Sequence, residues 1–194
     1  MVSTFPVPTE PILRLSVAQY HAMIQAGILT EDDPVELING WLVEKMPKNP
    51  RHRVATKLLR TLLENSIPKG YYVDSQEPIT LSDSEPEPDV MVIQGETRDY
   101  LEGHPQAENI VLIVEVSDST LGRDRQIKKE LYARHNIQNY WILNLVDNKI
   151  EVFSQPESSQ LIYASELVFG FEEAVQISLN AEIEIAFSTQ QVLP

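Results

Sequence analysis

Cysteine is absent from the 194 residues, which excludes disulfide bonds and metal sites built on thiolates. Glycine is scarce, at seven residues, and no glycine-rich phosphate-binding loop is apparent. No apolar run approaches the roughly 20 residues of a membrane-spanning helix, because the longest, residues 110–114, has only the length of a strand. The first eleven residues lack the basic and apolar regions of a signal peptide. We therefore expect a cytoplasmic protein that does not enter membranes.

Positive charge is also in short supply, with 15 Lys and Arg residues against 29 Asp and Glu residues and a net charge of −14. This balance opposes nonspecific attraction to nucleic-acid phosphates or anionic membranes. An enzyme of this composition that acts on nucleic acid would need a local basic patch, bound cations or a partner. The two candidate patches are either phosphate contacts or solvated helix faces, and they contain Arg51, Arg53, Lys57, Arg123 and Arg125.

The chain has the length and composition of one globular domain, with 42% hydrophobic residues. We expect an irregular arm over residues 1–13 and a single domain over residues 14–194. Periodicity predicts helices at residues 17–25, 51–66 and 121–135 and strands at residues 35–38, 41–44, 71–73, 88–93, 110–116, 139–143 and 149–153. Short strands are also expected at residues 79–81 and 161–163, while residues 178–187 fit a helix or a strand. This order indicates an α/β or α+β fold with one mixed sheet.

Two of the apolar strands carry a carboxylate. Asp89 stands at the start of one strand, and Glu115 follows five apolar residues in another. An ionised carboxylate in apolar surroundings is costly unless a cation or hydrogen bonds compensate it. Two such groups brought together form a natural site for a hard divalent cation such as Mg²⁺. A metal-dependent enzyme is the resulting hypothesis.

The helix that follows Glu115 supplies a candidate amine. Asp124, Lys128 and Tyr132 are each four residues apart and share one helix face, close to the core-facing Leu131. A lysine there would stabilise developing negative charge, while a bound metal would polarise a phosphoryl oxygen and activate water. This combination of groups is typical of phosphodiester hydrolysis.

Each of these residues also has a simpler interpretation. Asp89 could cap a turn after Pro88, and Glu115 could end a strand in solvent or pair with an arginine. Lys128 could form an exposed pair with Asp124, which would leave Lys129 as the rival site lysine. The pattern alone leaves these alternatives open.

The ordered set of motifs resembles the Uma2 family, also called DUF820, which belongs to the PD-(D/E)xK nuclease superfamily and is abundant in cyanobacteria. The resemblance covers about residues 14–155. It rests on residues 35–40, Arg51 and His52 at a helix start, and residues 88–90, 115–120, 124–132 and 140–142.

The resemblance implies a restriction-endonuclease-like fold, in which helices flank a mixed central sheet, with Asp89 and Glu115 as ligands of Mg²⁺ or Mn²⁺. In the plainest pattern of the superfamily a lysine lies two residues after the second acid, where this chain has Ser117. Uma2-like chains take the lysine from the following helix, which corresponds to Lys128 here. Glu36 would be the third carboxylate that is typical of such sites.

The sequence therefore favours a Mg²⁺-dependent endonuclease or phosphodiesterase that acts on nucleic acid, with DNA as the expected substrate. The catalytic residues would be Asp89, Glu115, Lys128 and Glu36. One alternative is a noncatalytic protein-interaction module on the same fold, which would suit the acidic surface. Another is a metal-dependent hydrolase of a small phosphorylated metabolite. A homodimer through edge strands of the hairpin at residues 140–153 is a further expectation.

Overall fold

The structure is a computed structural model, and it describes residues 12–30 and 32–194. The predicted arm at residues 1–13 lies almost entirely outside this part. The longer helices are α1 (Val17–Gln25) and α2 (Pro50–Ser66). A third helical region joins α3 (Leu121–Arg123), the π-helical turn η3 (Asp124–Lys128) and α4 (Lys129–Arg134). The strands are β1 (Val35–Ile38), β2 (Trp41–Glu44), β3 (Tyr71–Asp74), β4 (Val90–Gln94), β5 (Ile110–Ser117), β6 (Asn139–Asn144), β7 (Lys149–Glu157), β8 (Ile162–Phe169), β9 (Ala174–Ser178) and β10 (Glu184–Ser188).

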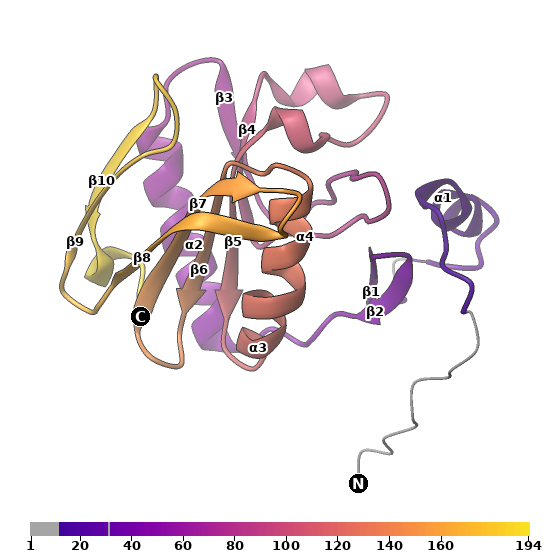
Figure 1. Cartoon of the computed structure of the whole chain (residues 1–194), viewed down its shortest axis with the longest axis horizontal. Coiled ribbons are helices and arrows are strands. Elements are labelled where there is room, and N and C mark those ends of the chain that lie inside the picture. Colours follow the sequence, from indigo (N-terminus) through magenta and orange to yellow (C-terminus); the bar gives the residue numbers. More distant parts are fainter. Residues whose placement is uncertain (1–11, 31) are drawn as a thin grey trace, which may run out of the picture.

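A mixed sheet of six strands, in the order β3-β4-β5-β6-β7-β8, forms the centre of the molecule. Its strands pair antiparallel except β5 and β6, which are parallel and are joined by the α3–α4 helical region. A parallel connection needs a crossover of this kind, and the helix covers one face of the sheet (Figure 1). The mixed α+β fold expected from the sequence is confirmed.

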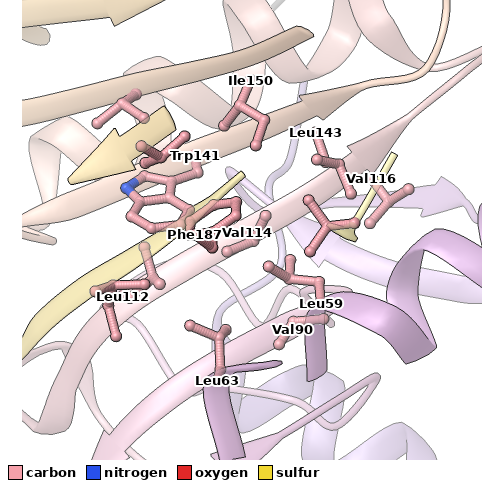
Figure 2. Close-up of a cluster of buried hydrophobic side chains, with 14 of the residues drawn as sticks. Leu59, Leu63, Val90, Leu112, Val114, Val116, Trp141, Leu143, Ile150 and Phe187 are labelled. Atoms are coloured by element: carbon pink, nitrogen blue, oxygen red, sulfur yellow. The ribbon is translucent and has the colours of Figure 1, made fainter. Parts of the chain in front are cut away.

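Two apolar cores lie on opposite faces of this sheet. Helix α2 and the β9–β10 hairpin pack on one face, where Phe187 stacks on the fully buried Trp141 (Figure 2). Leu59 and Leu63 on α2 belong to the same core and confirm the apolar stripe predicted for that helix. Helix α4 packs on the other face through Leu131 and its neighbours. Alternation along β5 places Glu115 on the α4 side, two residues after the buried Ile113.

The β1–β2 hairpin and α1 lie to one side of the main sheet (Figure 1). Asn39 and Gly40 form the hairpin turn with positive φ angles of 53° and 78°, as the Asn-Gly pair predicts. A Cβ atom on Gly40 would lie 2.6 Å from the Cβ atom of Arg14, so only glycine fits this approach. The turn therefore fixes the position of β1, which carries Glu36.

Several sequence predictions need correction. Residues 79–81 form no strand, and only an isolated bridge at Thr80 is present. The segment that lies opposite them contains Pro86 and Pro88, which have no N–H group to donate to a strand partner. The ambiguous region 178–187 resolves into the end of β9, a turn and most of β10. The hairpin at residues 140–153 offers no free edge for a dimer, because β5 and β8 flank its two strands.

Candidate active site

The register of β4 and β5 brings the two predicted metal ligands together. These strands pair antiparallel with Val90 opposite Val114 and Met91 opposite Ile113. Continuing this register by one residue places Asp89 opposite Glu115. Residues directly opposite on an antiparallel pair share one face of the sheet. The two carboxylates, 26 residues apart in sequence, therefore meet at the same end of the sheet.

Asp89 is held by two hydrogen bonds to a single carboxylate oxygen. Its Oδ2 accepts from the backbone N–H of Val116 at 2.9 Å and lies 3.0 Å from Nε2 of His52. His52 comes from the first turn of α2, which begins after the N-cap Asn49 with Pro50 in the first turn. The helix start thus delivers an imidazole to Asp89 and keeps that carboxylate in a fixed orientation.

Glu115 lies deeper, between an ammonium and a phenol. Its Oε1 accepts hydrogen bonds from Nζ of Lys128 at 2.9 Å and from the hydroxyl of Tyr132 at 2.7 Å. Burial raises the pKa of Glu115 to about 8, because the low-dielectric surroundings disfavour the anion more than Lys128 favours it. Burial alone would lower the pKa of Lys128, but the carboxylates around it raise that pKa above its ordinary value. Lys128 is therefore a buried ammonium.

The helix that carries Lys128 is not a regular α-helix at this point. Residues Asp124–Lys128 form a π turn, in which the N–H of Lys129 bonds to the carbonyl of Asp124 five residues earlier. The side chain of Asp124 accepts from Ser117 Oγ at 2.7 Å, and its carbonyl accepts from the Tyr140 hydroxyl at 3.0 Å. These contacts hold the widened turn against the sheet. Such turns often occur at functional sites, and this one keeps Lys128 beside Glu115.

Glu36 reaches the same site from β1. Its Oε2 accepts from Lys128 Nζ at 3.2 Å and from the backbone N–H of Glu87 at 3.2 Å. One ammonium therefore bridges Glu36 and Glu115. Glu36 is only 2% exposed, so its side chain points into the site and not to the solvent.

All four residues predicted to be catalytic line one pocket of about 70 Å³. Within the described part of the chain, Asp89 Oδ1 and Glu115 Oε2 have no hydrogen-bond donor, and Glu36 Oε1 has only the guanidinium of Arg123, at 4.0 Å. None of these oxygens is among the fully enclosed unpaired atoms. These oxygens are therefore open to the pocket.

This donor set fits a hard cation with a mixed shell. No three His, Asp or Glu side chains of residues 12–30 and 32–194 converge closely enough to enclose a metal by themselves. Mg²⁺ commonly takes one or two carboxylates and completes its shell with water and substrate phosphate. Asp89 and Glu115 are the residues that would hold it here.

The structure separates the five arginine and lysine residues predicted to bind nucleic acid. Arg123 alone among them lines the pocket, and its buried Nε has no partner in the described chain. Arg125 is committed to a two-pronged ion pair with Glu151, at 2.9 and 2.6 Å. Arg51 donates to the carbonyl of Leu145 at 2.7 Å. The remaining two, Arg53 and Lys57, are exposed on α2.

Between the two candidate lysines the geometry favours Lys128. Lys129 lies over the ring of Phe153 at 4.0 Å and pairs with Glu166 at 3.2 Å, away from the acids. His52 and Tyr132 were not among the site residues predicted from the sequence, although both contact predicted ligands. The signal for Tyr132 was its four-residue spacing from Lys128, whereas nothing in the sequence linked His52 to Asp89.

Comparison with known proteins identifies the family. The sequence profile of Uma2, described as "Putative restriction endonuclease", matches residues 17–190, which is most of the chain. The chain belongs to the Uma2 family. Its fold is similar to the crystal structure of "a putative nuclease belonging to DUF820" from Anabaena variabilis ATCC 29413, with a TM-score of 0.66. That likeness covers 87% of this chain and 94% of the other at 17% identity, which supports the fold alone. No curated protein matches the chain.

Membership confirms the resemblance seen in the sequence and the nuclease-like fold. The Uma2 match includes every residue of the pocket discussed above, from Glu36 on β1 to Lys128 in η3. Among the described residues, no helix has the length and apolar character needed to cross a membrane.

Proposed function

We propose that this Uma2 protein is a metal-dependent endonuclease that hydrolyses DNA in the cytoplasm, with Mg²⁺ or Mn²⁺ as its cofactor. The observation that carries the proposal is the position of Asp89 opposite Glu115, at the end of one sheet and beside the ammonium of Lys128. Both the family description and the fold of the solved neighbour support a nuclease.

Each residue of the pocket has a distinct role in the proposed reaction. A divalent cation bound there would polarise a phosphoryl oxygen and lower the pKa of an attached water. His52 and Tyr132 hold Asp89 and Glu115 in place through the contacts described above. Lys128 places a buried positive charge beside the reacting phosphate, where the low dielectric strengthens its effect. Arg123 also lines the pocket, where its Nη2 lies 4.0 Å from Glu36 Oε1, and its guanidinium adds a second positive charge to the site.

The size of the pocket favours a nuclease over the metabolite hydrolase considered from the sequence. At about 70 Å³ it has room for an ion, a few waters and a phosphoryl group. Sites that enclose whole small molecules usually measure about 300–1,000 Å³. A substrate that presents one phosphodiester and keeps its remaining bulk outside is the better match. A noncatalytic module would have no need for two buried carboxyl groups, Asp89 and Glu115, that each present an unpaired oxygen to one pocket.

The test is cleavage of plasmid and linear DNA with Mg²⁺, Mn²⁺ or EDTA. We expect cleavage that requires the metal and that is lost in Asp89→Asn and in Glu115→Gln. Asp32→Asn is the matched control, because Asp32 is exposed and lies outside the pocket, and it should cleave like the wild type. Cleavage that persists in clean Asp89→Asn protein, or in EDTA, would reject the proposal.

A further inference from the structure

A second depression, of about 420 Å³, lies beside the pocket between the exposed face of α2 and the turn after β3. Its lining is polar, with three basic residues and one acid on the helix side and hydroxyl and amide groups on the turn. It contains Arg53, Thr56, Lys57, Arg60, Thr61, Glu64, Ser75 and Gln76. We call this depression the α2 groove.

Both walls of the α2 groove are tied to Asp89. On the helix side, Thr56 Oγ1 donates to the carbonyl of His52 at 2.9 Å, and the His52 ring contacts Asp89. On the turn side, the N–H of Gln76 donates to the carbonyl of Pro88, the residue before Asp89, at 2.9 Å. The groove therefore adjoins the end of the sheet where the acids meet.

The charge of the groove is opposite to that of the molecule. Arg53 and Lys57 are exposed, and neither takes part in an ion pair within the described part of the chain. The single acid, Glu64, pairs with Arg60 at 2.8 Å and so cancels only one cation. A local positive surface on a chain of net charge −14 is the feature that an acidic nucleic-acid enzyme would require.

We propose that the α2 groove binds the phosphodiester backbone of one DNA strand and leads that strand to the pocket. This inference rests on the proposed function and specifies how the same site holds its substrate. Arg53 and Arg60 are seven residues apart, or about 10 Å along the helix, which is the length of about three stacked nucleotides. Phosphates would contact Arg53 and Lys57, and Gln76 offers a further hydrogen-bonding side chain on the opposite wall. Arg60 pairs with Glu64 and donates to Ser75 Oγ at 3.0 Å, so it joins the two walls.

Such contacts position a strand without reading its sequence. Cations and hydroxyl groups recognise phosphate and sugar, whereas sequence is read at base edges or through DNA shape. No aromatic side chain lines the groove, so stacking on bases contributes nothing there. Binding is therefore expected to vary little with sequence and to weaken strongly with salt.

The test is fluorescence anisotropy with labelled single-stranded and duplex DNA of equal length in EDTA, so that binding is measured without cleavage. The variant is the double substitution Arg53→Ala with Lys57→Ala. The matched control is Arg98→Ala with Lys69→Ala, because both residues are exposed and neither lines the groove. At 50 mM salt we expect the groove variant to bind at least about tenfold more weakly. Its log–log salt slope should shrink by about 1.4 on single strands or 1.8 on duplexes, which corresponds to two lost contacts.

Comparing the affinities for single-stranded and duplex DNA shows which form of DNA the groove binds. Tighter binding of the single strand assigns the groove to unpaired ends or loops, and tighter binding of the duplex assigns it to one backbone of a double helix. If the groove variant and the control have the same affinity and salt slope, the groove does not bind the DNA backbone. Failure of every DNA to bind would likewise overturn it. The cleavage test on Asp89 is independent of these results, so an active nuclease with an unaffected groove variant would refute this inference alone.

Discussion

The raised pKa of Glu115 makes a quantitative prediction about stability and pH. Its ordinary value is 4.5, and in the folded protein it rises to about 8. The folded state therefore holds this proton more tightly than the unfolded chain does. As a result, the contribution of Glu115 to the free energy of unfolding is fully present below about pH 4.5 and is lost as pH rises toward 8.

The magnitude follows from the two pKa values. Between pH 5 and 7 the unfolded chain is mostly deprotonated at this group and the folded protein mostly protonated, which integrates to about 1.8 pH units of differential proton binding. At about 1.4 kcal/mol per unit, the loss is roughly 2–3 kcal/mol. Glu115→Gln keeps a side-chain oxygen for Lys128 and Tyr132 but cannot titrate.

The assay is urea unfolding of the wild type and of Glu115→Gln from pH 5 to 8. The stability of the variant relative to the wild type should rise by roughly 2–3 kcal/mol between pH 5 and 7, since all other titrating groups are common to both proteins. Because bound Mg²⁺ favours the carboxylate, it should stabilise the wild type more at pH 8 than at pH 6. Parallel stability curves for the two proteins in the absence of metal would refute the assignment of a buried, proton-holding Glu115.

Three further substitutions test the packing around the site by chemical unfolding. Lys128→Met should lower the free energy of unfolding by about 3–5 kcal/mol, because it leaves buried carboxyl groups without their cation. Lys129→Met, at a more exposed ion pair, should lower it by less than about 1 kcal/mol. Equal losses in the two variants would contradict the burial argument. Tyr132→Phe should cost about 1–3 kcal/mol by removing a buried donor, and an unchanged stability would mean that the hydroxyl is dispensable. Gly40→Ala should lower the free energy of unfolding by about 1–3 kcal/mol, because of the positive φ at this position and the close contact of an added Cβ atom. Gly122→Ala, whose Cβ atom would meet no atom within 4 Å, should be neutral or stabilising. An unchanged stability in Gly40→Ala would show that the turn can relax.

Periodicity was enough to predict the central sheet and its flanking helices. Apolar residues at three- and four-residue spacing gave α2, and the β-branched run gave β5, because both patterns reflect burial within the element itself. The incorrect strand prediction at residues 79–81 arose because that strand would depend on a partner elsewhere in the chain. Residues 79–81 look apolar enough for a strand, but the prolines opposite them remove the hydrogen bonds that a strand partner must supply.

The candidate site divides in the same way. Asp89 and Glu115 could be singled out because a carboxylate in an apolar strand is conspicuous in the sequence. Their pairing depends on strand register, and the contact of Lys128 depends on a π turn held by Ser117 and Tyr140, neither of which leaves a local sequence signal. The contact between His52 and Asp89 joins residues 37 positions apart on different elements, so only the tertiary structure reveals it.

The most direct test of the central claim is a crystal of the protein soaked in Mn²⁺ and measured at the manganese absorption edge. The account predicts one strong anomalous peak within bonding distance of carboxylate oxygens from both Asp89 and Glu115, with Lys128 still beside the site. A peak that touches neither acid, or an empty pocket at millimolar Mn²⁺ and neutral to alkaline pH, would contradict it.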